Sequence, residues 1–214
     1  MASYYPIALR LEGRCCLVVG GGSVALRRVR SLLDAGAQVI VRAPQVHPQL
    51  EELGARGVLT VQRAEFDGCI PEGTALVIAS TDRDEVNLRV VEAARRAGIL
   101  CADAAEPHRG DFVVPSCIRR GDLILAVTTG GQSPALAARI ARELAEQYGP
   151  EYEEYVGLLG EMRRQVLSIP IADERRRDVL RKLAEDAEIL ELVQQGRLAE
   201  ARERAQKCIS CWLG

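Results

Sequence analysis

The sequence is poor in aromatic residues and in long apolar runs. Aromatic residues make up 4% of the 214 residues, so a hydrophobic core must be built from Val, Leu, Ile and Ala. Apolar content is nonetheless 48%, which is ample for such a core. No apolar run reaches the roughly 18 residues that a membrane-spanning helix needs. We therefore expect a globular chain that does not enter a membrane.

The chain also lacks an excess of charge of either sign. Lys and Arg total 28, Asp and Glu total 30, and both signs are interspersed. A surface that binds nucleic acid or an anionic membrane requires a concentrated positive field, which this pattern does not provide. The first residues, MASYYPIALRLEGR, lack the basic start and apolar stretch of a signal peptide. We therefore expect a cytoplasmic protein that does not bind nucleic acid.

Histidine is scarce, and cysteine gives only weak evidence for a metal site. The chain has two histidines, and its seven cysteines are scattered. We expect most of these cysteines to be reduced thiols beside apolar stretches. Cys208 and Cys211 form a CxxC, but one such pair without a second pair or a nearby histidine is a weak metal signal. We predict no metal ligands, and favour an unpaired terminal pair over a metal or redox role.

Apolar runs and helical patterns alternate through the N-terminal half of the chain. Short continuous apolar runs such as CCLVV suit strands that are buried on both faces of a parallel sheet. Between them, apolar residues recur at helical spacing, as in SVALRRVRSLLDAG. Strands are predicted at 15–19, 38–41, 59–63, 75–80 and 99–103, and helices at 23–36 and 84–98. This alternation predicts an α/β fold with a doubly wound parallel sheet.

The pattern changes after residue 112. FVVPSCI at 112–118 and DLILAVTT at 122–129 are joined by RRGD, which predicts a hairpin turn. A helix should follow, with Ser133 as its N-cap and Pro134 at its first position. The charged C-terminal sequence predicts three more helices, at 151–169, 173–196 and 197–208. We therefore divide the chain into a sheet domain, a short middle segment and an α-helical C-terminal domain, at 1–112, 113–149 and 150–214.

A glycine-rich turn joins the first predicted strand to the first predicted helix. Gly20, Gly22 and Ala25 form the pattern G-x-G-x-x-A, which is typical of a Rossmann-type dinucleotide site. Gly20 permits the tight turn, Gly22 lets the backbone approach a pyrophosphate, and Ala25 lets the helix pack closely on the sheet. The N–H groups of Ser23 and Val24 would favour the phosphates. The alternative is a glycine-rich turn that binds no ligand.

The residue at the end of the second predicted strand leaves the choice of cofactor open. Many NAD sites have an acid there, whereas this chain has Arg42. Arg42 could bind the 2′-phosphate of NADP. It could equally be a solvated side chain beside a ribose that is held by the main chain of Ala43, Pro44 and Gln45.

The loop after the fourth predicted strand is expected at the same edge of the sheet. Thr81 and Asp82 follow that strand, so they are candidates for the nicotinamide side of the site. The alternative role of Asp82 is to cap the next helix.

Three segments in this order resemble those of a known family. GGGSVALRR, ASTDRDEVNLRV and DFVVPSCIRRGDLILAVTTGGQSPALAARIARELAE are similar to the precorrin-2 dehydrogenase family, the siroheme synthase module that is often also called a sirohydrochlorin ferrochelatase. The resemblance covers essentially the whole chain, and TTGGQSP is its most specific motif. It implies an NAD-binding Rossmann domain, a middle segment that forms a homodimer, and a helical domain that covers the tetrapyrrole.

The resemblance implies NAD-dependent oxidation of precorrin-2 to sirohydrochlorin, followed in some members by insertion of ferrous iron. Because precorrin-2 carries many carboxylates, arginines suited to bidentate pairing should bind it. The candidates are Arg109, Arg119, Arg120 and Arg176. Thr129, with Thr128, takes the place of the family's hydroxyl pair and would orient the substrate, unless both are ordinary strand threonines.

The chain departs from the family in the segment CADAAEPHRGDF. Aligned on Pro107, the position of the family's proposed catalytic aspartate is Ala105. In an extended backbone Asp103 would share the face of Ala105, about 7 Å away. Our hypothesis is that Asp103 replaces the base, with Glu106 as the second candidate and a transfer that needs no strong base as the third. His108 is either an iron contact or an exposed loop residue.

The missing aspartate also weakens the case for iron insertion, so we expect weak chelatase activity or none. Two other functions stay open. One is a regulatory module that senses NAD(P) without turning over a tetrapyrrole. The other is an unrelated NADP reductase in which Arg42 binds the phosphate.

Overall fold

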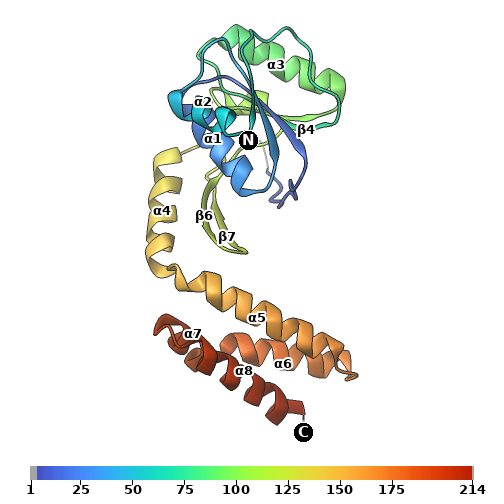
Figure 1. Cartoon of the computed structure of the whole chain (residues 1–214), viewed down its shortest axis with the longest axis vertical. Helices are drawn as coiled ribbons and strands as arrows, with labels where there is room; N and C mark the ends of the chain where they lie inside the picture. The colour runs from blue at the N-terminus through green and yellow to red at the C-terminus, as the bar shows by residue number, and fades with distance from the viewer. Residues whose placement is uncertain (1–3, 214) are drawn as a thin grey trace. The chain divides into compact units, whose positions relative to one another are not determined.

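The computed structural model describes residues 4–213, with the side chains of residues 4–211. The chain divides into two compact units (Figure 1). The first contains the residues up to Val114 together with 130–132, and the second contains Pro115–Thr129 and the residues from Ser133 onward. The middle segment expected at 113–149 therefore lies mostly in the same unit as the helices that follow it.

The first unit is built on a five-stranded parallel sheet with the strand order β3-β2-β1-β4-β5. This confirms the doubly wound parallel sheet. The order reverses between β1 and β4, and ligands of such sheets bind outside the carboxyl ends of the strands at this point. The elements are β1 (Cys15–Val19), α1 (Ser23–Asp34), β2 (Gln38–Arg42), α2 (Pro48–Ala55), β3 (Thr60–Gln62), β4 (Thr74–Ala79), α3 (Asp84–Ala97), β5 (Leu100–Asp103) and the 3-10 turn η1 (Pro107–Arg109).

The central strand β1 contributes to a hydrophobic core on each face of the sheet. Its residues alternate, so that Cys16 and Val18 pack with α1 while Leu17 and Val19 pack on the side of α3. All four are at most 1% exposed. Helices α1 and α3 therefore cover opposite faces (Figure 1). The apolar run CCLVV is continuous because β1 is buried on both faces of the sheet, as the sequence predicted.

The second unit begins with a two-stranded antiparallel hairpin of β6 (Ser116–Arg120) and β7 (Leu123–Val127). Gly121 in the turn has φ +55°, a conformation that favours glycine. The first strand begins later than FVVPSCI predicted, directly after Pro115. Proline has no N–H for a strand ladder, which explains the late start. Helix α4 (Pro134–Gln147) packs on this hairpin and begins as predicted, because Ser133 accepts a hydrogen bond from the Leu136 N–H at 3.3 Å.

The C-terminal part of the second unit contains four helices where the sequence predicted three. They are α5 (Glu151–Ser168), α6 (Asp173–Glu185), α7 (Ala187–Gln194) and α8 (Leu198–Leu213). The predicted helix at 173–196 is wrong because Asp186 leaves the helical conformation and becomes the N-cap of α7. The helices share a core that includes Tyr155, Met162 and Ile189. In the described part of the chain, no helix combines the length and apolarity that crossing a membrane requires.

The carboxylate of Asp186 stabilises the break between α6 and α7. It accepts a hydrogen bond from the Glu188 N–H at 3.1 Å, and it forms an ion pair with Arg204 at 2.9 Å. The Cys208 thiol donates to the same carboxylate at 3.4 Å. Burial opposes the charged form of Asp186, but the hydrogen bonds from Arg204 and Cys208 hold its pKa below the ordinary value.

We expect Asp186→Ala to lower the free energy of unfolding of the second unit by about 1–3 kcal/mol, because the helix loses its cap and Arg204 its partner. The control is Asp178→Ala, which removes an exposed pair with Arg181 and should cost less than about 0.5 kcal/mol. Urea unfolding measures both.

The same carboxylate makes the stability depend on pH. Since the pKa of Asp186 is lower in the folded chain, its contribution to the free energy of unfolding is present above the ordinary carboxyl pKa and is lost as the pH falls through the folded value. Equal losses in both variants would contradict this account.

Candidate functional site

A cavity of about 690 Å³ lies in the first unit, at the carboxyl ends of β1, β2 and β4. This is where the strand order of the sheet reverses. The structure brings together at this cavity all of the residues that the sequence assigned to a cofactor. They are Gly20, Gly22, Ser23, Val24, Ala43, Pro44, Gln45, Thr81 and Asp82.

The three consecutive glycines after β1 meet different constraints. Gly20 has φ +127°, and a Cβ there would lie 2.4 Å from the Ser80 carbonyl oxygen. A Cβ on Gly21 would lie 2.0 Å from the Gln45 carbonyl oxygen, whereas one on Gly22 would meet nothing within 4 Å. Gly20 and Gly21 are therefore required by the protein's own packing, and Gly22 leaves space in the cavity. The sequence pattern missed Gly21, whose only signal was that it completes a run of glycines.

The N-terminus of α1 opens onto this space. Gly22 is the N-cap and makes no side-chain capping bond, and the first turn contains no acidic residue. The N–H groups of Ser23 and Val24 and the positive end of the helix dipole therefore favour a bound anion. Ala25 is fully buried, as close packing of α1 on the sheet requires. This arrangement fits the pyrophosphate of a dinucleotide.

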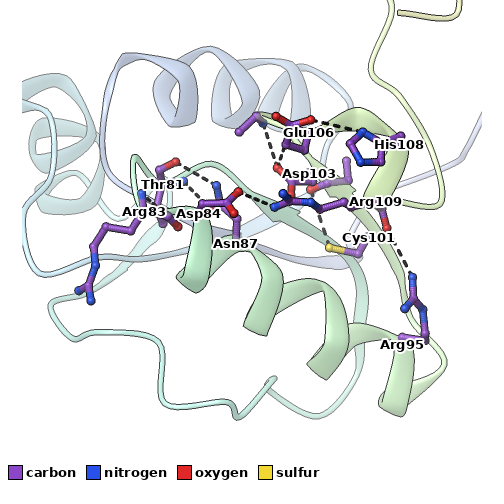
Figure 2. Close-up of polar contacts among 12 residues, drawn as sticks. Thr81, Arg83, Asp84, Asn87, Arg95, Cys101, Asp103, Glu106, His108 and Arg109 are labelled. Carbon is purple, nitrogen blue, oxygen red and sulfur yellow. Dashed lines mark hydrogen bonds and ion pairs between the residues drawn. The ribbon is translucent and has the colours of Figure 1, made fainter.

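A buried amide shapes the loop after β4 (Figure 2). Asn87 is fully buried, and its Oδ1 accepts hydrogen bonds from the Thr81 N–H at 3.0 Å and the Thr81 hydroxyl at 2.8 Å. Its Nδ2 donates to the Thr81 carbonyl at 3.0 Å. Arg83, not Asp82, occupies the N-cap position of α3, so Asp82 lines the cavity without capping the helix. Sequence reasoning missed Asn87, because it lies within a helix and away from the loop it stabilises.

The Arg42 side chain at the end of β2 is 11% exposed, so it is not the solvated residue of one sequence alternative. Its Nε donates to Gln62 Oε1 at 2.8 Å. Its Nη1 donates to Asp67 Oδ1 at 2.9 Å and to the Cys69 carbonyl at 2.8 Å. The guanidinium group is therefore bound to β3 and to the loop that follows it.

Asp103, at the end of β5, has a carboxylate that is fully buried. Its Oδ1 accepts hydrogen bonds from the N–H groups of Ala105 at 2.9 Å and Glu106 at 3.1 Å. The chain bends at Ala104 and Ala105, so the extended backbone that would place Asp103 and Ala105 on one face is not present. That geometric expectation was wrong because an Asp side chain can bond to the backbone two residues on and so form a turn.

The remaining polar residues of this loop form two ion pairs, one between Arg109 and Asp84 and one between His108 and Glu106 (Figure 2). Arg109 forms an ion pair with Asp84 in the first turn of α3, and its Nη1 lies 4.0 Å from Asp103 Oδ2. The hydrogen bond with Asp84 raises the pKa of Arg109. The Glu106 side chain is 45% exposed and lies 3.3 Å from Nδ1 of His108. Of the two candidate bases, Glu106 exposes its carboxylate to solvent and Asp103 does not.

Arg119 and Arg120 are adjacent on β6 and differ in their surroundings. Arg119 is exposed. Arg120 donates to the carbonyl groups of Tyr148 at 3.1 Å and Ala145 at 3.3 Å. Arg120 therefore satisfies carbonyl groups at the C-terminal end of α4, which explains its conformation without a ligand.

Thr129 and Arg176 also make contacts within the second unit. The Thr129 hydroxyl accepts a hydrogen bond from the Ser133 N–H at 2.9 Å, next to the start of α4. Arg176 donates to the carbonyl groups of Ile169 and Ile171, both at 3.3 Å, and pairs with Asp173. Thr129 stabilises the connection between β7 and α4, and Arg176 stabilises the connection between α5 and α6. Neither role was apparent from the sequence.

Residues 4–211, whose side chains are described, contain no group of three or more His, Cys, Asp or Glu side chains placed to hold a metal ion. The pKa of the Cys208 thiol is raised, first by burial and then by its hydrogen bond to Asp186. The protonated thiol is therefore favoured, and a protonated thiol is a poor metal ligand.

Two family models match the chain. The model described as "Putative NAD(P)-binding" matches residues 7–116, and the model described as "Sirohaem biosynthesis protein central" matches residues 120–147. The first match contains the sheet and its cavity, and the second contains β7 and α4.

Curated relatives and a solved structure are similar over most of the chain. Siroheme synthase 3 of Aeromonas hydrophila is 40% identical over 86% of this chain and 39% of its own length. The siroheme synthase of Nitrosococcus oceani is 43% identical over 68% of this chain and 32% of its own. The solved structure of SirC, precorrin-2 dehydrogenase, has a TM-score of 0.71 and 28% identity, and the match covers 95% of this chain and all of that one. The chain thus spans about two fifths of the curated relatives or less.

The fold and the cavity define the class as a Rossmann protein with an NAD(P)-binding domain. Within that class, the chain belongs to the precorrin-2 dehydrogenase and sirohydrochlorin ferrochelatase family. It is similar to one part of the longer siroheme synthases.

The glycine turn yields a matched pair of variants. We expect Gly21→Ala to lower the free energy of unfolding by about 2 kcal/mol or more, because its methyl group would collide with backbone atoms. Gly22→Ala should stay within about 1 kcal/mol of wild type, because its methyl group meets no protein atom. It should still weaken dinucleotide binding about tenfold, since the methyl group occupies the space that a pyrophosphate needs. Unfolding and binding titrations measure these effects, and tight binding by Gly22→Ala would contradict the assignment.

Proposed function

We propose that this chain catalyses the NAD-dependent oxidation of precorrin-2 to sirohydrochlorin in siroheme biosynthesis. The observation that carries the proposal is the cavity at the carboxyl edge of the sheet, where the glycine turn and an uncapped helix N-terminus leave space for a pyrophosphate. The likeness to a solved precorrin-2 dehydrogenase over nearly the whole chain supports the choice of substrate.

The residues of the cavity divide into three groups by the part of the cofactor that each would hold. The N–H groups of Ser23 and Val24 would bind the pyrophosphate, the main chain of 43–45 would bind the adenosine ribose, and Thr81 and Asp82 would border the nicotinamide. When bound, NAD supplies the acceptor for a hydride from precorrin-2. The buried bonds of Asn87 to Thr81 fix the loop on that side before any ligand arrives.

NAD is proposed in preference to NADP because of Arg42. A 2′-phosphate needs a guanidinium group that can turn toward it. Arg42 donates instead to Gln62, Asp67 and Cys69, and its side chain is mostly buried.

Oxidation of precorrin-2 removes a proton together with the hydride, and Glu106 is our proposed acceptor of that proton. The sequence favoured Asp103, but a buried carboxylate that already accepts two backbone N–H groups is placed to position the loop. Glu106 lies in the same loop, exposes its carboxylate and lies 3.3 Å from His108 Nδ1. It would take the role of the aspartate that the family has at the position of Ala105.

The second unit is proposed to form a homodimer and to bind the substrate. A two-stranded hairpin is marginally stable by itself, and Ile124 of β7 is 46% exposed. A second copy of the chain would cover this surface.

Arg119 is the most accessible of the proposed carboxylate ligands, while Arg109, Arg120 and Arg176 make contacts within the protein. We expect insertion of ferrous iron to be weak or absent.

The direct test is to add precorrin-2 and NAD to the full chain and follow the absorption spectrum, then to repeat it with ferrous iron. We expect the spectrum of sirohydrochlorin with NAD and little further change with iron. If NAD binds but precorrin-2 is not consumed, the chain is an NAD-sensing module and the proposed activity is wrong.

The assignment of the proton acceptor predicts a contrast between two loop variants. Glu106→Gln should lower kcat by roughly a hundredfold, as expected when a general base is lost. Asp103→Asn should keep kcat within about threefold, because the asparagine oxygen can still accept the N–H groups of Ala105 and Glu106. Glu92→Gln, an exposed change on α3, serves as the control. A larger loss in Asp103→Asn than in Glu106→Gln would return the role to Asp103.

A further inference from the structure

Arg42 occupies the place where dinucleotide folds distinguish NAD from NADP. It ends β2 and lines the cavity beside Ala43, Pro44 and Gln45. A guanidinium group at this place is suited to pair with a 2′-phosphate. The chain therefore carries a group able to bind NADP, and its selectivity must depend on what holds that group.

Asp67 is the charged partner of Arg42, and the backbone fixes its position. The same Asp67 oxygen accepts hydrogen bonds from Arg42 Nη1 and from the Cys69 N–H, each at 2.9 Å. The N–H of Cys69, with the charge of Arg42, holds the pKa of Asp67 below its ordinary value. The carboxylate is therefore ionised at neutral pH.

The loop that carries Asp67 is itself anchored to the first unit. Phe66 is 4% exposed within the core on the side of α3, and its carbonyl accepts a hydrogen bond from Arg89 at 3.1 Å. Phe66 also lines the cavity. On the other side of Asp67, the Cys69 N–H donates to its Oδ1 and the Cys69 carbonyl accepts from Arg42 Nη1 at 2.8 Å. The carboxylate and this carbonyl therefore bind the same guanidinium group. A phosphate that approached Arg42 would have to displace this carboxylate and would meet its negative charge.

We propose that Asp67 determines the cofactor preference of this chain by holding the Arg42 guanidinium against the loop after β3, so that the cavity takes NAD and excludes the 2′-phosphate of NADP. In this account Asp67 is a specificity-determining residue that acts through Arg42. The proposal rests on the dinucleotide site of the proposed function, but it does not depend on precorrin-2 as the substrate.

The test is direct binding of NAD and of NADP to the full chain by calorimetric titration. Wild type should bind NAD more tightly than NADP. In Asp67→Ala, Arg42 loses its charged partner and keeps the neutral acceptors Gln62 and Cys69, which a phosphate can displace more easily. The Kd for NADP should therefore fall about tenfold or more, as expected for a new charge-assisted hydrogen bond to phosphate. The Kd for NAD should stay within about threefold, because the contacts of the glycine turn are unchanged. Arg42→Met combined with Asp67→Ala should return the Kd for NADP to the wild-type value.

Two further variants separate this effect from charge and from misfolding. Asp34→Ala removes an exposed acid at the end of α1 and should leave the ratio of the two Kd values unchanged. If Asp67→Ala does not fold, Asp67→Asn is measured instead, because an amide oxygen can still accept the Cys69 N–H. It should shift the ratio toward NADP at least threefold.

The proposal is overturned if wild type binds NADP as tightly as NAD, or if removal of Asp67 shifts the ratio less than twofold. It is also overturned if the shift persists without Arg42. Binding of NAD by wild type without oxidation of precorrin-2 would count against the proposed function. The comparison of the Kd values for NAD and NADP would still test the role of Asp67.

Discussion

The close approach of three backbone segments at the carboxyl end of β1 is the constraint on which the site depends. The turn after β1 passes very near the loops after β2 and β4. A Cβ on Gly21 would lie 2.0 Å from the Gln45 carbonyl oxygen, and a Cβ on Gly20 would lie 2.4 Å from the Ser80 carbonyl oxygen. This contact aligns the ends of the three strands and directs the start of α1 into the cavity. Gly22 then contributes the space, because nothing in the protein lies where its side chain would be. Packing and ligand space thus come from adjacent glycines.

The loops around this point are each held by one polar side chain that bonds to backbone groups. Asn87 holds the loop after β4, Asp103 the loop after β5, and Asp67 the loop after β3. Such bonds satisfy backbone N–H groups that no strand partner reaches, and they fix the loops in the absence of a ligand. The carboxylate of Asp103 is fully buried, and its Oδ1 already accepts two backbone N–H groups. The proposal for Glu106 follows from this difference in exposure.

The sheet and the cofactor edge could be predicted from the sequence because their signals are local. The apolar run of β1, the glycines and the helix start lie within about a dozen residues, and each has a direct physical meaning. The orientation of the Arg42 side chain could not be predicted, because it depends on Asp67, which lies 25 residues further along the chain. The bend after Asp103 and the break at Asp186 were missed for one reason. An Asp that caps a turn competes with regular structure, and apolar periodicity does not record that competition.

The most direct test of the account is a crystal structure of the chain with bound NAD. We predict the pyrophosphate within hydrogen-bonding distance of the N–H groups of Ser23 and Val24, the adenosine ribose beside Ala43 to Gln45, and the nicotinamide toward Thr81 and Asp82. The Arg42 guanidinium should remain on Asp67. A pyrophosphate bound away from the start of α1, or NAD bound outside this cavity, would contradict the account.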